Sequence, residues 1–305
     1  MNTKPHTDIK SDGWINRVFP SSLRPYATLA RLDRPVGIWL LLLPGWWAIA
    51  LASGGIGSMK LEDWRFAALF AAGAVIMRGA GCVINDLWDR KLDKQVERTR
   101  ARPLASGAVS PRQAMVFLGG LLLAGLAVLL QMNPVTVMLG FLVMPLIIAY
   151  PLMKRLTWWP QAFLGLTFNF GALMGWSAVI GVIGLPALCL YAAGICWTLG
   201  YDTIYAHQDK EDDLIAGIKS TALKFGANSK KWVAGFYGAA MALLTAALFT
   251  GAGGAGAWMI FVPVMGAHLA WQIKNWRPDS PDSSLKTFRS NRDFGLIVLA
   301  AALFS

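Results

Sequence analysis

The chain has 305 residues, of which 55% are hydrophobic and 15% are charged, and its mean hydropathy is +0.48. This composition is typical of membrane proteins with several spans and excludes an ordinary soluble domain. The formal net charge of +11 could indicate nucleic-acid binding in a soluble protein, but here the basic residues gather in the segments between apolar runs, so we expect a lipid bilayer and no nucleic acid as partner.

Residues 1–34 form the predicted N-terminal tail. Polar residues alternate there with Trp14, Ile15, Val18 and Phe19, which is compatible with a helix at the membrane interface or with a partly disordered tail. Because no apolar run precedes residue 35, we expect no secretory signal peptide in this tail.

Nine apolar runs follow, each long enough for a membrane span of about 20 residues. The predicted spans cover 35–52, 64–84, 112–131, 135–151, 160–182, 186–206, 231–250, 254–274 and 288–304. We therefore predict an all-α polytopic membrane protein, with nine transmembrane helices forming one domain over residues 35–305.

The basic residues predict the orientation of these spans. Of the 28 Lys and Arg, 25 lie in the tail or in four later segments, which are 85–112, 154–155, 210–231 and 274–292. The connections near 132–134, 183–186 and 251–256 have none. This is the positive-inside pattern, so we expect the N-terminus and the basic loops in the cytoplasm, the C-terminus outside, and the protein in the cell (inner) membrane.

Two acidic clusters, at 85–93 and 201–213, follow directly on apolar runs and hold eight of the seventeen acidic residues. Carboxylates at membrane depth are costly and mark functional sites. In a helix, at about 100° per residue, the first cluster places four oxygen-bearing side chains on one face. These are Asn85, Asp86, Asp89 and Asp93.

The second cluster contains Asp202, Asp209 and Asp213, which share an arc of roughly 40° in an unbroken helix. Such a helix would separate Asp202 from Asp213 by about 16 Å, so one ion could not contact both. Oxygen ligands without paired His or Cys favour Mg²⁺ over Zn²⁺. The sequence therefore predicts a magnesium site that includes residues of both clusters.

The loops beside the clusters add seven basic residues over 85–112 and four over 207–230. Cations beside carboxylates suit a di-anionic headgroup, and an apolar cavity suits a lipid tail. A polyprenyl diphosphate has both parts. Metal ions would neutralise charge on the leaving diphosphate, and the allylic carbocation would need a dry site.

Six motifs in order resemble the intramembrane aromatic prenyltransferases of the UbiA superfamily, specifically the 4-hydroxybenzoate polyprenyltransferase branch, over residues 25–305. The motifs are Arg34-Pro35-Val36-Gly37, Asn85-Asp86-x-x-Asp89-x-x-x-Asp93, Arg98-Thr99-x-x-Arg102-Pro103-Leu104-x-Ser106-Gly107, Tyr150-Pro151-x-x-Lys154-Arg155, Asp202-x-x-Tyr205-Ala206-x-x-Asp209-x-x-Asp212-Asp213 and Gly217-Ile218-Lys219-Ser220-Thr221-Ala222. The resemblance implies nine helices around a central cavity that opens laterally to lipid. It also implies magnesium-dependent transfer of a polyprenyl group from polyprenyl diphosphate to the ring carbon ortho to the phenol of 4-hydroxybenzoate, in ubiquinone synthesis.

The resemblance also implies roles for individual residues. The Mg²⁺ ligands would be Asn85, Asp89, Asp209 and Asp213, with Asp86, Asp93 and Asp202 as additional or supporting ligands. Catalysis would involve Asp89, Asp202, Asp209 and Arg155. Tyr150 and Lys154 would contact the diphosphate and Arg155 the carboxylate of the aromatic acid, while Arg34, Lys91 and Lys219 would lie near the anionic ends of the two substrates.

Two alternatives stay open. A prenyltransferase of the same fold could use another acceptor, as in menaquinone, chlorophyll or haem O synthesis, although Tyr205-Ala206 and Lys219-Ser220-Thr221 resemble the 4-hydroxybenzoate branch. A cation-coupled transporter would also carry carboxylates in its spans. Its binding site should lie near the bilayer midplane, whereas both clusters here lie at span ends.

Overall fold

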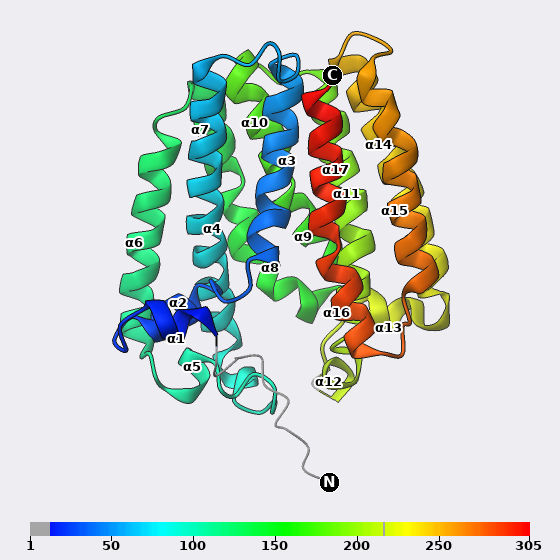
Figure 1. Ribbon diagram of the computed structural model, residues 1–305. Coiled ribbons are helices and arrows are strands. Elements are labelled where there is room, and N and C mark those ends of the chain that lie inside the picture. Colours follow the sequence, from blue (N-terminus) through cyan, green and yellow to red (C-terminus); the bar gives the residue numbers. More distant parts are fainter. Residues whose placement is uncertain (1–12, 216) are drawn as a thin grey trace. The chain divides into compact units, whose positions relative to one another are not determined.

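The computed structural model describes residues 13–215 and 217–305, and for Asp212 only the backbone. The elements within these residues are all helices (Figure 1). They divide into two compact units. Unit 1 contains Met1–Ile38 and Ala72–Val128, and unit 2 contains Trp39–Ala71 and Leu129–Ser305.

Unit 1 is built from short helices at the start of the chain and from parts of longer ones. Its elements are α1 (Trp14–Val18), α2 (Arg24–Leu29), the first residues of α3 (Val36–Ala52), most of α4 (Leu61–Asp93), α5 (Pro103–Ser106) and α6 (Pro111–Leu129). The residues expected to form an interfacial helix are helical over α1, with Ile15 buried and Trp14 exposed. A small core of Leu29, Val83 and Leu104 holds α2, α4 and α5 together.

Unit 2 contains the remaining parts of α3 and α4 and all later helices. These are α7 (Pro134–Leu142), α8 (Met144–Leu156), α9 (Pro160–Phe168), α10 (Phe170–Ile180), α11 (Leu185–Ala206), α12 (Lys210–Ile215), α13 (Thr221–Phe225), η1 (Gly226–Asn228), α14 (Ser229–Gly251), η2 (Ala257–Ile260), α15 (Phe261–Asn275), α16 (Pro281–Arg289) and α17 (Asn291–Leu303). Helix α11 contacts α9, α10, α14 and α16 and is the central helix of this unit.

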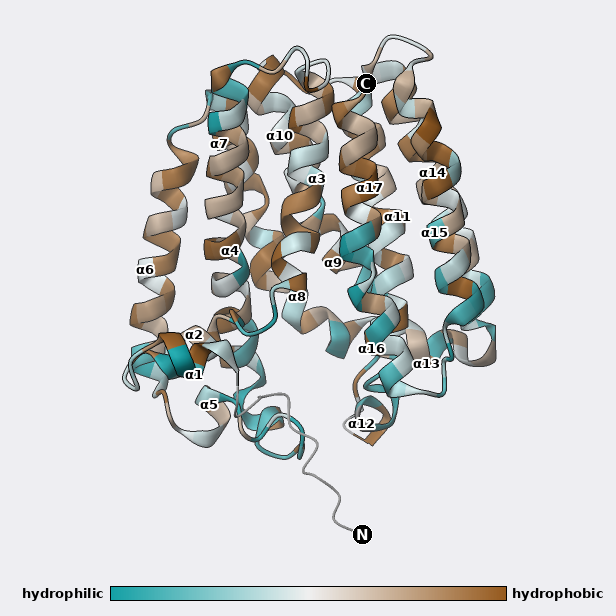
Figure 2. Cartoon of the chain, in the orientation of Figure 1, coloured by the Kyte–Doolittle hydropathy of each residue, from teal (hydrophilic) through white to brown (hydrophobic). Residues whose placement is uncertain are grey.

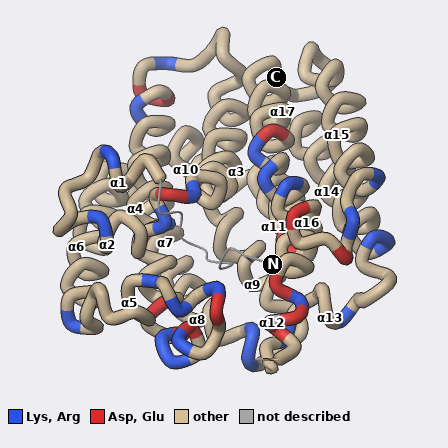
Figure 3. Tube along the Cα trace, turned by 60° about the horizontal axis from the view of Figure 1, so that its bottom comes forward, with Lys and Arg blue, Asp and Glu red and all other residues tan. Residues whose placement is uncertain are grey.

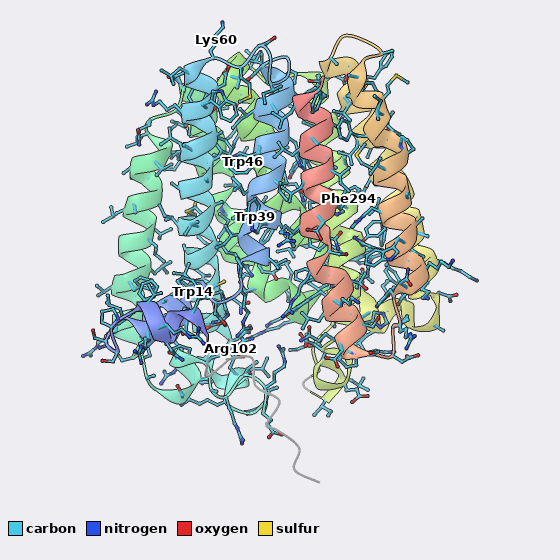
Figure 4. All side chains as sticks on the ribbon, viewed as in Figure 1. Trp14, Trp39, Trp46, Lys60, Arg102 and Phe294 are labelled. Carbon is cyan, nitrogen blue, oxygen red and sulfur yellow. The ribbon has the colours of Figure 1, made fainter. Side chains whose placement is uncertain are left out.

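Aromatic side chains and paired polar groups fix the packing around α11. Trp197 of α11 contacts Phe294 of α17, with ring centroids 5.6 Å apart (Figure 4), and its indole N–H donates to Asn291 Oδ1 at 2.8 Å. The hydroxyl of Tyr237 on α14 donates to Gln272 Oε1 at 2.7 Å. Unpaired polar groups cost several kcal/mol within a bilayer, so these bonds allow polar side chains to remain between apolar helices.

Among the described residues, six helices are long and apolar enough to cross a membrane. They are Leu61–Asp93, Pro111–Leu129, Pro134–Leu156, Pro160–Ile180, Leu185–Ala206 and Thr221–Gly251. Three of these ranges join consecutive elements, which are α7 with α8, α9 with α10, and α13 with η1 and α14. Figure 2 shows hydrophobic residues along most of α6 and hydrophilic ones around α12 and α16. The chain is therefore an integral membrane protein with an all-helical fold.

The other three predicted spans coincide with shorter helices, α3 of 17 residues, α15 of 15 and α17 of 13. Part of the predicted span 254–274 is taken by η2, and the start of 288–304 belongs to α16. The apolar sequence is thus divided between elements at these places, and a count of nine spans stays a prediction.

Close packing of α11 on α14 generates a stability prediction. A Cβ atom at Gly200 would overlap the ring of Tyr237, which its hydrogen bond to Gln272 holds in place. We expect Gly200→Ala to lower the free energy of unfolding by about 1–3 kcal/mol, the usual cost of overpacking. Unfolding with increasing SDS in mixed micelles measures the change.

The matched control is Gly238→Ala on α14, where a Cβ would meet nothing within 4 Å. This variant should be neutral or slightly more stable, since Ala favours helix over Gly. Equal losses in the two variants would contradict the packing described for α11.

Candidate functional site

The first acidic cluster lies at the end of α4 in unit 1. Helix α4 has 33 residues, or about 50 Å at 1.5 Å per residue, which exceeds the roughly 30 Å of bilayer hydrocarbon. Its last apolar stretch ends at Ile84 and is followed by the mainly polar segment 85–93. The helix continues unbroken through Asp93, so Asn85, Asp89 and Asp93 share one face as predicted, beyond the apolar stretch.

Asp86 forms a buried ion pair that the sequence analysis did not predict. Arg31 Nη2 donates to Asp86 Oδ1 at 2.8 Å and to Oδ2 at 2.9 Å, and the exposed fractions of the two residues are 7% and 1%. Arg31 has φ +57°, which is uncommon for a residue other than glycine. Both oxygens of Asp86 thus accept a hydrogen bond from Arg31, and a metal ion at Asp86 could use only their remaining lone pairs.

A second arginine, Arg102, connects the following loop to the same cluster (Figure 4). Its Nη1 lies 3.1 Å from Asp93 Oδ1 and 3.6 Å from Asp86 Oδ1, while the hydroxyl of Thr99 donates to the Asp93 carbonyl at 3.0 Å. The Arg98–Gly107 motif therefore folds back on the end of α4.

The remaining candidates of unit 1 occupy different environments. Asp89 is 1% exposed, and Asn85 is half-buried. Lys91 is exposed on the last turns of α4. Arg34 is half-buried at the start of α3, and its Nε donates to Asp33 Oδ2 at 3.0 Å.

The second acidic cluster lies in unit 2, and its helix is not continuous. Helix α11 ends at Ala206 and α12 begins at Lys210, so the spacing calculated for an unbroken helix from Asp202 to Asp213 does not apply. The amide N–H of Asp213 donates to the Asp209 carbonyl at 2.8 Å, which keeps these two residues one turn apart. Asp202 lies, half-buried, on the last turns of α11.

His207 explains where α11 ends. Its Nε2 lies 2.8 Å from Ser229 Oγ on α14, its Nδ1 lies 3.2 Å from the Pro278 carbonyl, and the ring contacts Trp276 edge-on. Burial, followed by the charge of Lys210, lowers the pKa of His207 to about 4. The imidazole is therefore neutral at neutral pH, and both of its nitrogens serve to anchor the turn before Asp209.

The basic substrate candidates of unit 2 are brought together by backbone pairing. The amide N–H of Lys219 donates to the Lys154 carbonyl at 2.8 Å, and Lys219 Nζ donates to the Leu156 carbonyl at 3.3 Å. Arg155 is exposed beside them, and Tyr150 lies one turn earlier on α8. Two motifs separated by about sixty residues of sequence thus form one cationic region.

Gln161 and Thr203, which the sequence analysis did not select, bind Thr221 of the motif at 217–222 and hold this region in place. Gln161 Oε1 accepts from the Thr221 N–H at 3.1 Å, and the hydroxyls of Thr203 and Thr221 lie 2.7 Å apart. All three residues are buried. Their only signal in the sequence is the presence of polar side chains next to apolar runs, which many membrane helices share.

The donor set fits magnesium chemically. The candidate ligands are carboxylates and one amide, which are the oxygen donors that Mg²⁺ prefers. Within the described part of the chain, no three His, Cys, Asp or Glu side chains converge to form a complete metal site.

Residues 41–297 match the UbiA prenyltransferase family. The chain is 48% identical over 298 residues to a protein of Arabidopsis thaliana named 4-hydroxybenzoate polyprenyltransferase, mitochondrial, covering 97% of this chain and 72% of that one. It is 49% identical over 283 residues to the Homo sapiens protein of that name, covering 92% and 74%.

Two solved structures share the fold. The apo structure of a UbiA homologue from Aeropyrum pernix has a TM-score of 0.71 at 25% identity, covering 86% of this chain and 96% of that one. A UbiA homologue from Archaeoglobus fulgidus bound to GPP and Mg²⁺ has a TM-score of 0.67 at 19% identity, covering 91% and 98%.

The buried pair of Arg31 and Asp86 generates the second prediction. Arg31→Ala leaves a buried carboxylate without its main cation, so we expect a loss of about 3–5 kcal/mol in unfolding free energy. Replacing both partners, as in Arg31→Met with Asp86→Leu, should restore most of that loss because no buried charge is left unpaired. Unfolding in SDS mixed micelles measures both variants.

Arg34→Ala is the control from the same segment. Its ion pair with Asp33 is partly exposed and should contribute less than about 1 kcal/mol. If Arg31→Ala cost no more than this control, the buried pair would not be what holds the segment before α3 against α4.

Proposed function

The chain belongs to the UbiA prenyltransferase family, and from this premise we propose that it transfers a polyprenyl group from polyprenyl diphosphate to 4-hydroxybenzoate, releasing diphosphate. The observation that carries this proposal is the identity of about half of the aligned residues to proteins named for that reaction, over nearly the whole chain. The acceptor position is the ring carbon ortho to the phenol, and the pathway is ubiquinone synthesis. Those names favour 4-hydroxybenzoate over the other acceptors and over transport.

The acidic motifs are proposed to hold the donor headgroup through Mg²⁺. Asn85 and Asp89 from α4 and Asp209 and Asp213 from the second motif would be the ligands. The metal would act as a Lewis acid that neutralises the charge of the departing diphosphate. A homologue of the same fold binds Mg²⁺ together with GPP, which supports this choice of metal.

The supporting residues fix the ligands before substrate arrives. Arg31 and Arg102 hold Asp86 and Asp93, so these two carboxylates are proposed to shape the end of α4 and to act as additional or supporting ligands. His207 fixes the turn that precedes Asp209. Donors and acceptors held in advance cost no reorganisation during the reaction.

The cationic region of unit 2 is proposed to hold the two anionic groups. Lys154 and Tyr150 would contact the diphosphate, with Lys219 beside them because its backbone pairs with Lys154. The guanidinium of Arg155 would hold the carboxylate of the aromatic acid by two parallel hydrogen bonds.

The remaining candidates have more general roles. Arg34 and Lys91 would add positive charge for the substrates, and Asp202 would take part in catalysis from the end of α11. Apolar helix surfaces around the motifs would exclude the water that would otherwise quench an allylic carbocation.

A direct assay tests the function. Purified protein with 4-hydroxybenzoate, Mg²⁺ and prenyl diphosphates of several chain lengths should form the prenylated acid. Removal of Mg²⁺ with a chelator should abolish turnover, and re-addition should restore it. No product with any donor, or equal turnover in the chelator, would contradict the proposal.

Arg155 and Lys154 should separate the two substrates kinetically. Arg155→Ala removes a planar partner for a carboxylate, so the KM for 4-hydroxybenzoate should rise much more than the KM for the prenyl diphosphate. Lys154→Ala should do the reverse. Steady-state kinetics with one substrate varied and the other saturating measures the split. A change confined to the diphosphate in Arg155→Ala would move the carboxylate contact to Arg34.

The proposed orientation is tested by labelling. The basic loops are placed in the cytoplasm by the positive-inside pattern, in the cell (inner) membrane. In a background without the native cysteines, Ile183→Cys and Ala255→Cys should react with an impermeant reagent from outside, and Arg100→Cys and Ala227→Cys only from the cytoplasm. All four positions are exposed. Labelling of positions 100 and 227 from opposite sides would rule out one shared site.

A further inference from the structure

A hollow on the surface of α14 lies outside the site described above. It is lined by Asn228, Lys231, Trp232, Gly235 and Phe236, with a volume of about 320 Å³, within the range of small-ligand pockets. A Cβ atom at Gly235 would meet nothing within 4 Å, so the missing side chain there leaves an open channel.

The lining changes in chemistry along the helix. Asn228 and Lys231 lie at the start of α14, where the helix N-terminus adds a partial positive charge. Gly235 and Phe236 lie one to two turns further on, and residues 233–251 contain no charged side chain. A ligand that fills the whole hollow therefore needs a polar end and an apolar end, in that order along α14.

A cluster of aromatic rings forms one side of the hollow. Trp232 stacks on Phe225 with ring centroids 4.7 Å apart and an interplanar angle of 11°, and both rings also contact Trp159 and Phe236. Trp232 is nevertheless 47% exposed. A tryptophan that is rigidly packed yet exposed at the start of an apolar helix is typical of the membrane interface.

The surroundings of the hollow are positive. Lysines occur at positions 224, 230 and 231, just before α14 and in its first turn, and the sequence has no Asp or Glu from 214 to 278. Lys224 lies over the ring of Trp159 at 5.3 Å, and Figure 3 shows basic residues beside α13. The ion pairs found among the described residues include neither Lys231 nor Lys230. The charge of the hollow thus complements an anionic headgroup.

We propose that this hollow binds one anionic glycerophospholipid. The phosphate accepts hydrogen bonds from Lys231 and Asn228, the glycerol rests against Trp232, and an acyl chain lies in the channel over Gly235 beside Phe236. A zwitterionic lipid would offer the same tail but would bring a cationic group toward the lysines. A soluble phosphate would leave the apolar half of the hollow unfilled.

Native mass spectrometry of the detergent-purified protein tests the proposal. Dissociation constants are measured for dioleoyl phosphatidylglycerol, for dioleoyl phosphatidylcholine and for soluble glycerol 3-phosphate. Phosphatidylglycerol should bind most tightly and glycerol 3-phosphate most weakly. Equal binding of the two lipids, or tighter binding of glycerol 3-phosphate, would overturn the proposal.

Variants locate the site. Lys231→Ala should weaken phosphatidylglycerol by about fivefold, the order expected for one lysine near an anionic surface, and should leave phosphatidylcholine nearly unchanged. Gly235→Leu fills the channel and should weaken both lipids. Each variant is checked by size-exclusion chromatography and circular dichroism, so that a loss of binding is not a loss of fold.

Lys60→Ala is the matched control. Lys60 is an exposed lysine just before α4 (Figure 4), and its substitution removes the same charge without touching the hollow. It should leave both dissociation constants unchanged. If Lys60→Ala weakened phosphatidylglycerol as much as Lys231→Ala, the effect would be one of net charge and the hollow would not be the binding site.

Discussion

The cost of keeping carboxylates next to apolar helices is the constraint on which the rest of this structure depends. A buried acid without a partner is strongly destabilising, and α4 carries Asp86 and Asp93 just beyond its apolar stretch. Arg31 approaches from the segment before α3 and Arg102 from the loop after α4. The two arginines explain why the short helices α2 and α5 fold against α4, and they preserve the face on which Asn85 and Asp89 lie.

In unit 2 hydrogen bonds hold the candidate site residues in place. His207 is neutral and joins α11, α14 and the segment before α16. The backbone hydrogen bond from Lys219 to Lys154 brings the motif at 217–222 next to the motif at 150–155. The candidate metal-binding and anion-binding residues of unit 2 thus lie on segments that longer apolar helices hold in position.

The parts of this arrangement that depend on local sequence could be predicted, and those that depend on distant contacts could not. The apolar runs and the helical period predict the long helices and the shared face of α4, because both are properties of neighbouring residues. The pair of Arg31 and Asp86 joins residues 55 positions apart, and nothing near Arg31 indicates it. The end of α11 at Ala206 agrees with the predicted span 186–206, but the interruption of the helix between Ala206 and Lys210 has no local signal, since no Gly or Pro lies between 207 and 213 and the helix is stopped by contacts of His207 with other helices. The division of the last apolar runs among η2, α15, α16 and α17 is likewise set by packing.

The two acidic motifs are proposed to act on one diphosphate, and a double-mutant cycle on binding tests whether they do. The affinity of a non-reactive prenyl thiodiphosphate, measured calorimetrically at fixed Mg²⁺, is compared for the unmodified protein, Asp89→Asn, Asp213→Asn and the double variant. If both carboxylates serve the same metal-bound headgroup, each single variant should weaken binding and the double variant should lose clearly less than the sum of the two losses, because residues in one network do not act additively. If the losses add within about 0.5 kcal/mol, which is the behaviour of independent sites, the two carboxylates do not serve the same headgroup. The same conclusion follows if neither single variant changes the affinity.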